Sequence, residues 1–138
     1  MKKMLELNYK IDEQVPLDKL VDLYKSVGWS IYFNLPMEQL ANIIYNSHHT
    51  IQVFSKDRLI GFARTFSDEV LYVTINDVIV HPEYQNNGIG RRIITHIREL
   101  YQEFPRQDFI RLFSEPGSEQ FYESLGLKRF KLIPYSLN

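Results

Sequence analysis

The chain has 138 residues, of which 44% are hydrophobic and 24% are charged, and its formal net charge is −1. This length predicts one domain, residues 1–138, and the composition excludes a disordered chain. The balanced charge argues against a nucleic-acid binder, and the absence of cysteine excludes disulfides, thiolate metal ligands and a cysteine nucleophile.

The first half of the chain is predicted to contain three strands and two helices. Alternating apolar residues indicate the strands, and a proline followed by apolar residues at helical spacing indicates each helix. An aromatic connector, residues 29–35, separates the two helices. In chain order the elements are a strand over 4–11, a helix from Pro16 to a stop at Gly28, a helix from Pro36, and strands over 50–54 and 59–66.

The second half is predicted to begin with the longest strand of the chain, residues 70–80, which is rich in β-branched residues. The helix that follows, from Gly88 to Glu103, has five large side chains on its core side, namely Ile89, Ile93, Ile94, Ile97 and Tyr101. A strand over 109–114, a short helix over 116–125 and a closing strand over 127–133 complete the order. This order predicts an α+β fold with a mixed, mostly antiparallel central sheet flanked by helices.

The segment QNNGIG, residues 85–90, joins the longest predicted strand to a predicted helix. The first N–H groups of a helix have no partners inside the helix, and the helix dipole adds partial positive charge there, so this turn suits a phosphate. A Walker A loop would need Gly-Lys-Ser/Thr, and a dinucleotide fingerprint would need a third glycine where Ile93 stands. Both of these phosphate sites are therefore excluded.

The same segment resembles the Gln/Arg-x-x-Gly-x-Gly/Ala signature of the GNAT superfamily of N-acetyltransferases. DVIVHPEY, residues 77–84, resembles the central strand and exit loop of that family, and FYESLGL, residues 121–127, resembles its Tyr-Glu-x-x-Gly-Phe segment. The predicted element order also matches the superfamily from end to end. The chain is identified by this resemblance as a small member, and the GNAT fold is expected.

The resemblance implies acetyl-CoA as the cosubstrate. Backbone amides of the glycine turn would hold its pyrophosphate, and the backbone of the central strand would pair with its pantetheine arm. No metal is expected, because the four histidines lack paired-ligand spacing. The residues implied for cofactor binding are Val78, Ile79, Val80, Asn86, Asn87, Gly88, Ile89, Gly90 and Arg91.

Two residues are candidates for catalysis of direct acetyl transfer to an amine, without a covalent intermediate. Tyr122 matches the family tyrosine near the thioester sulfur and would protonate the departing thiolate; the alternative is an ordinary core aromatic. Asp77, the only acid inside the strand predicted over 70–80, is a candidate base; it could equally pair with a cation or cap backbone, and a water relay could replace it. Asn76 and Asp77 are expected to point to opposite faces of the sheet.

The acceptor pocket is predicted at the aromatic connector, because the segment between the first two helices often walls the acceptor site in this family. Trp29, Tyr32 and Phe33, with Asn76 on the central strand, form the predicted wall. Aromatic faces suit an apolar or cationic acceptor, although the rings could simply cover the sheet. A small amine is favoured over a protein substrate.

Two other classes of function remain open. A GNAT-fold module could bind CoA or a metabolite without turnover, and the retained Tyr122 argues for the enzyme instead. A structural or interaction protein could dimerise through the strand predicted over 127–133, and a homodimer is compatible with all three classes. No stretch is long enough to span a membrane, and the cytoplasm is the expected compartment.

Overall fold

The computed structural model describes residues 6–138, and its elements follow the predicted order as far as the last helix. The strands are β1 (Leu7–Ile11), β2 (His49–Ser55), β3 (Arg58–Ser67), β4 (Val73–Val80) and β5 (Ile110–Arg111). The helices are α1 (Leu17–Ser26), α2 (Ser30–Phe33), α3 (Met37–Tyr45), α4 (Ile89–Leu100) and α5 (Glu119–Ser124), with short 3-10 helices at Pro82–Tyr84 and Gln107–Phe109.

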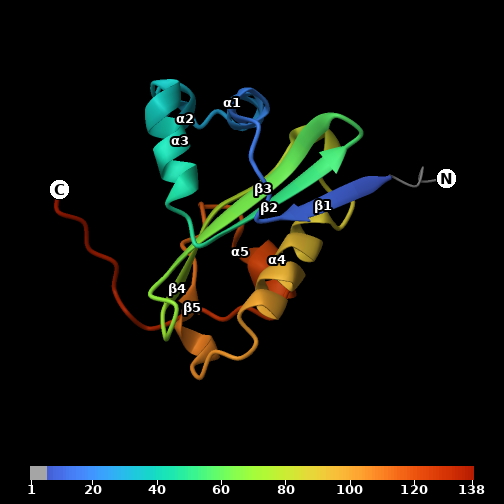
Figure 1. Cartoon of the computed structure of the whole chain (residues 1–138). Helices are drawn as coiled ribbons and strands as arrows, with labels where there is room; N and C mark the ends of the chain where they lie inside the picture. Colours follow the sequence, from blue (N-terminus) through green and yellow to red (C-terminus); the bar gives the residue numbers. More distant parts are fainter. Residues whose placement is uncertain (1–5) are drawn as a thin grey trace.

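The five strands form one sheet in the order β1-β2-β3-β4-β5, with helices on both faces (Figure 1). Neighbouring strands from β1 to β4 are antiparallel, and β5 runs parallel to β4. The sheet is therefore mixed and mostly antiparallel, and the predicted α+β class is confirmed.

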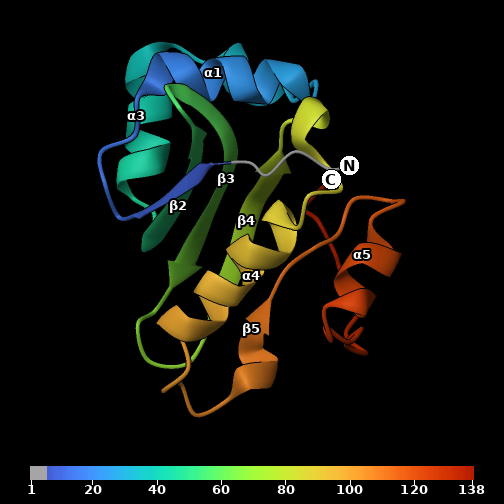
Figure 2. The same cartoon turned by 90° about the vertical axis from the view of Figure 1, so that its right-hand side faces the viewer.

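Helix α4 covers one face of the sheet, where it crosses in front of β4 (Figure 2). Its five predicted core residues are all buried, because their spacing places them on a single side of the helix. They pack against alternate strand residues, including Ile51, Val53, Ile60 and Ile75. Leu125, just after α5, joins the same cluster, so α4 and α5 belong to one layer.

Helices α1, α2 and α3 cover the opposite face of the sheet (Figure 1). Pro16 and Pro36 stand directly before α1 and α3, as predicted, and the missing N–H of proline costs nothing at a helix start. The buried side chains of this layer are Leu20, Leu23, Tyr24, Leu40 and Ile44 from the helices and Phe54, Leu59, Phe62 and Ile79 from the sheet. The predicted connector 29–35 differs from expectation, because it contains the single helical turn α2.

The prediction that residues 70–80 form the longest strand is wrong. The carboxylate of Asp68 accepts hydrogen bonds from the backbone N–H groups of Val70, Leu71 and Tyr72, and this holds them in a turn. β4 consequently starts at Val73 and has 8 residues, whereas β3 has 10.

The C-terminal strands also differ from the prediction. The strand predicted over 109–114 has only two residues, Ile110 and Arg111, and the closing strand predicted over 127–133 does not form. Residues 127–138 follow α5 as an irregular segment (Figure 1). A β-strand needs a partner ladder, and a two-residue neighbour offers too few hydrogen bonds to hold one. Residues 4 and 5 of the first predicted strand lie outside the described residues.

Candidate functional site

The glycine turn connects the end of β4 to the start of α4. Gly88 has a φ of 76°, a left-handed conformation that favours glycine, and Asn86 has a φ of 64°. A side-chain carbon added at Gly88 would meet no atom within 4 Å, so the turn is open on that side. The first hydrogen bond from α4 back to the turn joins Arg92 N–H to the Gly88 carbonyl, which leaves the earlier N–H groups of the helix available to an anion.

Among the described strands, none pairs with β4 along most of one side. Its ladder with β5 consists of two residue pairs, Val73 with Ile110 and Thr74 with Arg111. Beyond Thr74, no described strand pairs with this side of β4, and the divergence of β5 from β4 is visible in Figure 2. Val78, Ile79 and Val80 lie in this unpaired stretch, which leads directly into the glycine turn. Backbone groups there are placed to pair with an extended ligand.

A β-bulge interrupts β4 at Asp77, which has a φ of 57°. The register with β3 shifts at this point, from Ile79 opposite Phe62 to Asn76 opposite Arg64. Asn76 shares a face with Arg64 because the two are directly paired, and the Asp77 carboxylate also contacts Arg64. The prediction that Asn76 and Asp77 point to opposite faces is therefore wrong, because the inserted residue breaks the alternation.

The Asp77 carboxylate is buried and accepts hydrogen bonds from three sides. The Arg64 guanidinium donates from Nε at 2.5 Å, the Tyr32 hydroxyl at 2.8 Å and the Tyr24 hydroxyl at 3.0 Å. Only 5% of the Asp77 side chain and 6% of the Arg64 side chain are exposed, so the pair is desolvated. Of the sequence alternatives for Asp77, the structure displays the pairing with a cation. The network ties α1, α2 and β3 to the bulge.

Alkaline pH is expected to destabilise the protein through Tyr24. Burial and then the neighbouring Asp77 carboxylate raise the pKa of Tyr24 far above its ordinary value. Above about pH 10 the unfolded chain loses this proton while the native state keeps it. The free energy of unfolding, unaffected by this group below that pH, then falls by about 1.4 kcal/mol per pH unit.

Urea unfolding measured between about pH 9 and pH 12 tests this expectation. In Tyr24→Phe the free energy of unfolding should fall less steeply with pH, by about 1.4 kcal/mol per pH unit, because one titrating group has been removed. The variant also lacks the hydrogen bond from Tyr24 to Asp77 at every pH. An unchanged slope in the variant would contradict the assignment to Tyr24.

Tyr122 lies on α5 and is partly buried against the α4 layer. Burial alone raises the pKa of its hydroxyl, so the group remains protonated at neutral pH. A cleft of about 800 Å³ lies among α4, β4, β5, α5 and the C-terminal segment, and its lining includes Ile75, Leu112 and Tyr122. The structure thus brings Tyr122 to the side of the sheet where β4 and β5 diverge.

The aromatic residues predicted to wall the acceptor pocket pack against the core of the α1–α3 layer. Tyr32 stacks on Tyr24 with ring centroids 4.4 Å apart, and Trp29 lies 6.3 Å from both rings. Trp29, Tyr32 and Phe33 are each partly buried. This placement resembles the alternative in which the rings cover the sheet, and their contact with an acceptor stays a prediction.

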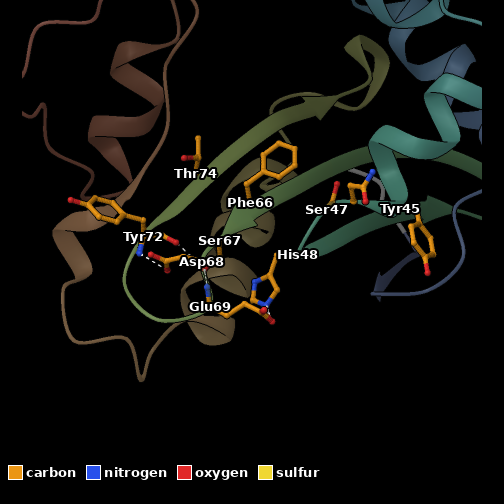
Figure 3. Close-up of a pocket in the computed structure, with 10 residues that line it drawn as sticks. Tyr45, Ser47, His48, Phe66, Ser67, Asp68, Glu69, Tyr72 and Thr74 are labelled. Atoms are coloured by element: carbon orange, nitrogen blue, oxygen red, sulfur yellow. Dashed lines mark hydrogen bonds and ion pairs between the residues drawn. The ribbon is translucent and has the colours of Figure 1, made fainter.

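An open cleft of about 550 Å³ lies on the same face of the sheet, between the end of α3 and the β3–β4 turn (Figure 3). Phe66 and Thr74 are paired across β3 and β4 at its floor, and the cleft edges carry Tyr45, His48 and Tyr72. Asp68 and Glu69 also line it, with Glu69 3.1 Å from His48. Phe66 and Thr74 lie two residues from Arg64 and Asn76 on the same strand face, so this cleft extends toward the bulge.

Sequence reasoning missed Arg64 and this cleft. Arg64 is the only charged residue in the mostly apolar run LIGFARTF, and a charge inside a buried strand signals a buried partner. Phe62, Arg64 and Phe66 alternate along β3 and therefore share one face of the sheet. Phe66 lies beyond the helices that cover this face, so its position could have identified an uncovered part of the sheet. Among residues 6–138, no group of three or more histidine or acidic residues could hold a metal ion. In the same range, no helix has the length and apolarity to cross a membrane.

The chain matches the model of the acetyltransferase (GNAT) family over residues 15–127. It is 36% identical over 114 residues to an uncharacterized N-acetyltransferase, ycf52-like, of Prochlorococcus marinus, a match that covers 80% of this chain and 61% of the relative. It is 28% identical over 145 residues to GCN5-related N-acetyltransferase 2, chloroplastic, of Arabidopsis thaliana, covering 89% of this chain and 54% of the relative. The chain therefore spans little more than half the length of these relatives.

The fold is similar to that of solved structures. The GNAT family acetyltransferase SP0256 of Streptococcus pneumoniae aligns with a TM-score of 0.76 at 24% identity, covering 96% of this chain and all of that one. An identity this low supports the architecture alone. Together with the family match, it agrees with the observed mixed sheet flanked by helices.

Proposed function

Because the chain belongs to the acetyltransferase (GNAT) family, we propose that it is an acetyl-CoA-dependent N-acetyltransferase that moves the acetyl group directly to an amine. The observation that carries this proposal is the unpaired side of β4. That stretch ends in the glycine turn and borders the cleft lined by Tyr122. Acetyl-CoA contains a thioester, a long polar arm and a pyrophosphate in this order. The Tyr122 cleft, the unpaired side of β4 and the glycine turn would contact these three parts in the same order.

The residues of the turn fit the phosphates of acetyl-CoA. The backbone of Asn86, Asn87, Gly88, Ile89 and Gly90 would offer N–H groups, and the exposed side chain of Arg91 would add a cation in the first turn of α4. Gly88 leaves open space where a side chain would otherwise stand. Val78, Ile79 and Val80 would supply the backbone groups that pair with the pantetheine arm. Bound acetyl-CoA supplies an activated acetyl group, and no metal is required.

The remaining residues of the chain would prepare the two reacting groups. An alkyl amine is about 0.1% neutral at pH 7, so a proton must leave the acceptor before the nitrogen attacks the thioester carbon. As the new amide bond forms and the carbon–sulfur bond breaks, the protonated Tyr122 hydroxyl would donate to the departing sulfur. Asp77 would act mainly by fixing the bulge, since its carboxylate is already engaged by three donors. Water would accept one proton from the ammonium before the attack. It would pass the second proton, released as the amide forms, to the Tyr122 oxygen and so restore the hydroxyl.

We place the acceptor in the cleft that starts at Phe66 and Thr74. Its two carboxylates, Asp68 and Glu69, and its aromatic edges suit a small cationic amine. Asn76 lies between this cleft and the bulge, on the face that a bound amine would approach.

Titration of acetyl-CoA into the purified protein by calorimetry tests this proposal. We expect micromolar binding, and we expect Gly88→Glu to weaken it by about 100-fold or more, because the variant places bulk and negative charge in the turn. Gly28→Glu is the matched control. Gly28 has a φ of 74° and open surroundings like Gly88, but it lies two residues after the end of α1, far along the chain from the turn.

Each outcome of the titration has a distinct meaning. Loss of affinity in Gly88→Glu but not in Gly28→Glu supports the phosphate site, and release of free thiol with an amine acceptor supports the enzyme. Binding without turnover over a broad amine screen would favour a module that senses CoA. Absence of binding by the unsubstituted protein would overturn the proposal.

A further inference from the structure

The two glycines of the QNNGIG turn face different surroundings. Gly88 needs its missing side chain for its backbone conformation, since its φ is positive and its surroundings are open. Gly90 is the second residue of α4 and is buried. A side-chain carbon built on Gly90 would lie 2.7 Å from Cζ of Phe121, far inside ordinary contact distance. The missing side chain at Gly90 thus makes room for a ring of α5, whatever the turn binds.

Phe121 is the neighbour of Tyr122 on α5, and their rings meet edge to face with centroids 5.0 Å apart. α5 has six residues, none of them fully buried. Tyr122 and the buried Leu125 pack against the α4 layer, and two further contacts join the helices. One contact is the Phe121 ring against Gly90. Another is the hydrogen bond from Arg98 of α4 to the carbonyl of Leu125, at 2.6 Å. Two positions of α4 that lie eight residues apart, or about 12 Å along the axis, therefore contact the middle of α5 and the residue that follows it.

From this arrangement we infer that Gly90 is a positioning residue for Tyr122. The space left by the missing side chain of Gly90 accommodates the Phe121 ring. The position of this ring then sets the distance between the phosphate-binding turn and the Tyr122 hydroxyl. In the proposed complex, pairing of the pantetheine arm with the backbone of β4 fixes the distance between the pyrophosphate and the sulfur of acetyl-CoA. A correctly placed Tyr122 therefore requires α5 to be held at a set position along α4. This inference rests on the proposed function.

Gly90→Ala is the primary test. Its new carbon requires the Phe121 ring to retreat by about 0.7 Å, from 2.7 Å to the 3.4 Å of ordinary contact. Displacement of a catalytic group by about 1 Å can lower a rate by about 100-fold, and we expect kcat to fall by at least tenfold. The Kd for acetyl-CoA should stay within about twofold, because the backbone N–H groups of the turn are unchanged. Alanine is also a better helix former than glycine, so helix propensity gives no reason for instability.

Rescue by a second substitution separates positioning from general damage. Phe121→Leu removes the ring atoms that the new carbon would meet, so the double variant Gly90→Ala/Phe121→Leu should have the kcat of Phe121→Leu alone. Glu99→Ala, an exposed substitution on the same helix, is the control for adding alanine to α4. Unchanged kcat in Gly90→Ala, or a loss that Phe121→Leu does not rescue, would overturn the inference.

Urea unfolding of the same four proteins, the unsubstituted chain, both single variants and the double variant, gives a readout that needs no turnover. Contact between positions 90 and 121 predicts a non-additive double-mutant cycle, and additive changes in unfolding would overturn the inference. Failure of the proposed function has a different signature, which is absence of acetyl-CoA binding by the unsubstituted protein. The cycle would then still report whether Phe121 sits on Gly90.

Discussion

Tyr122→Phe is expected to lower kcat by about 100-fold, the lower end of what a positioned general acid contributes. The variant keeps the ring, which packs against the α4 layer, and removes only the hydroxyl. Burial raises the pKa of that hydroxyl, so it carries its proton throughout the neutral range and can donate it to a departing thiolate. Because the ordinary pKa of tyrosine is about 10, loss of activity from ionisation of Tyr122 should begin only above that pH.

Thiol release under saturating acetyl-CoA measures this change directly. The Kd for acetyl-CoA should be nearly the same in both proteins, since the phosphate-binding turn lies on another element. Tyr135→Phe is a suitable control, because Tyr135 is 90% exposed in the C-terminal segment. Turnover equal to that of the unsubstituted protein would remove Tyr122 from the mechanism and leave it as a packing residue.

Asp77→Asn is expected to cost about 3–5 kcal/mol of stability, the range for breaking a buried ion pair by removing one partner. The substitution leaves the Arg64 charge buried without its counter-ion. It also offers a single acceptor oxygen to a site with three donors. The midpoint of urea unfolding measures the loss, which should be far greater than that of Asp57→Asn at an exposed turn.

The same variant separates the two roles considered for Asp77. Asp77→Asn combined with Arg64→Met should be more stable than the sum of the single variants predicts, because the second change removes the unpaired charge. If Asp77 only fixes the bulge, the pH profile of kcat keeps its shape in the variant. Loss of the acidic limb of that profile, with little change in unfolding, would instead identify Asp77 as the base.

Local patterns in the sequence were sufficient for most of the fold. The isoleucines of α4 recur at helical spacing, Pro16 and Pro36 precede their helices, and Gly88 marks the turn, so each of these elements is defined by nearby residues. Such signals do not depend on which strand lies next to which. The turn and the Tyr122 segment flank the same side of β4, and their roles in binding and catalysis stay predictions.

Features that depend on distant partners could not be predicted in this way. The bulge at Asp77 arises from the pairing of β4 with β3, and its effect on Asn76 cannot be seen in β4 alone. The packing of Phe121 depends on the space beside Gly90, which lies 31 positions earlier in the chain. Residues 127–133 alternate well enough for a strand, yet no described strand offers them a long enough ladder.

The short ladder between β4 and β5 divides the molecule into two parts of unequal cooperativity. β1 to β4 share three long ladders, whereas β5 and everything after it are attached by two residue pairs and by contacts with α4. Segments with so few ties open locally at a small fraction of the global unfolding free energy. A ligand that contacts both β4 and α5 holds these two parts of the molecule together. Ligand binding and the folding of the C-terminal part onto β4 are then thermodynamically linked.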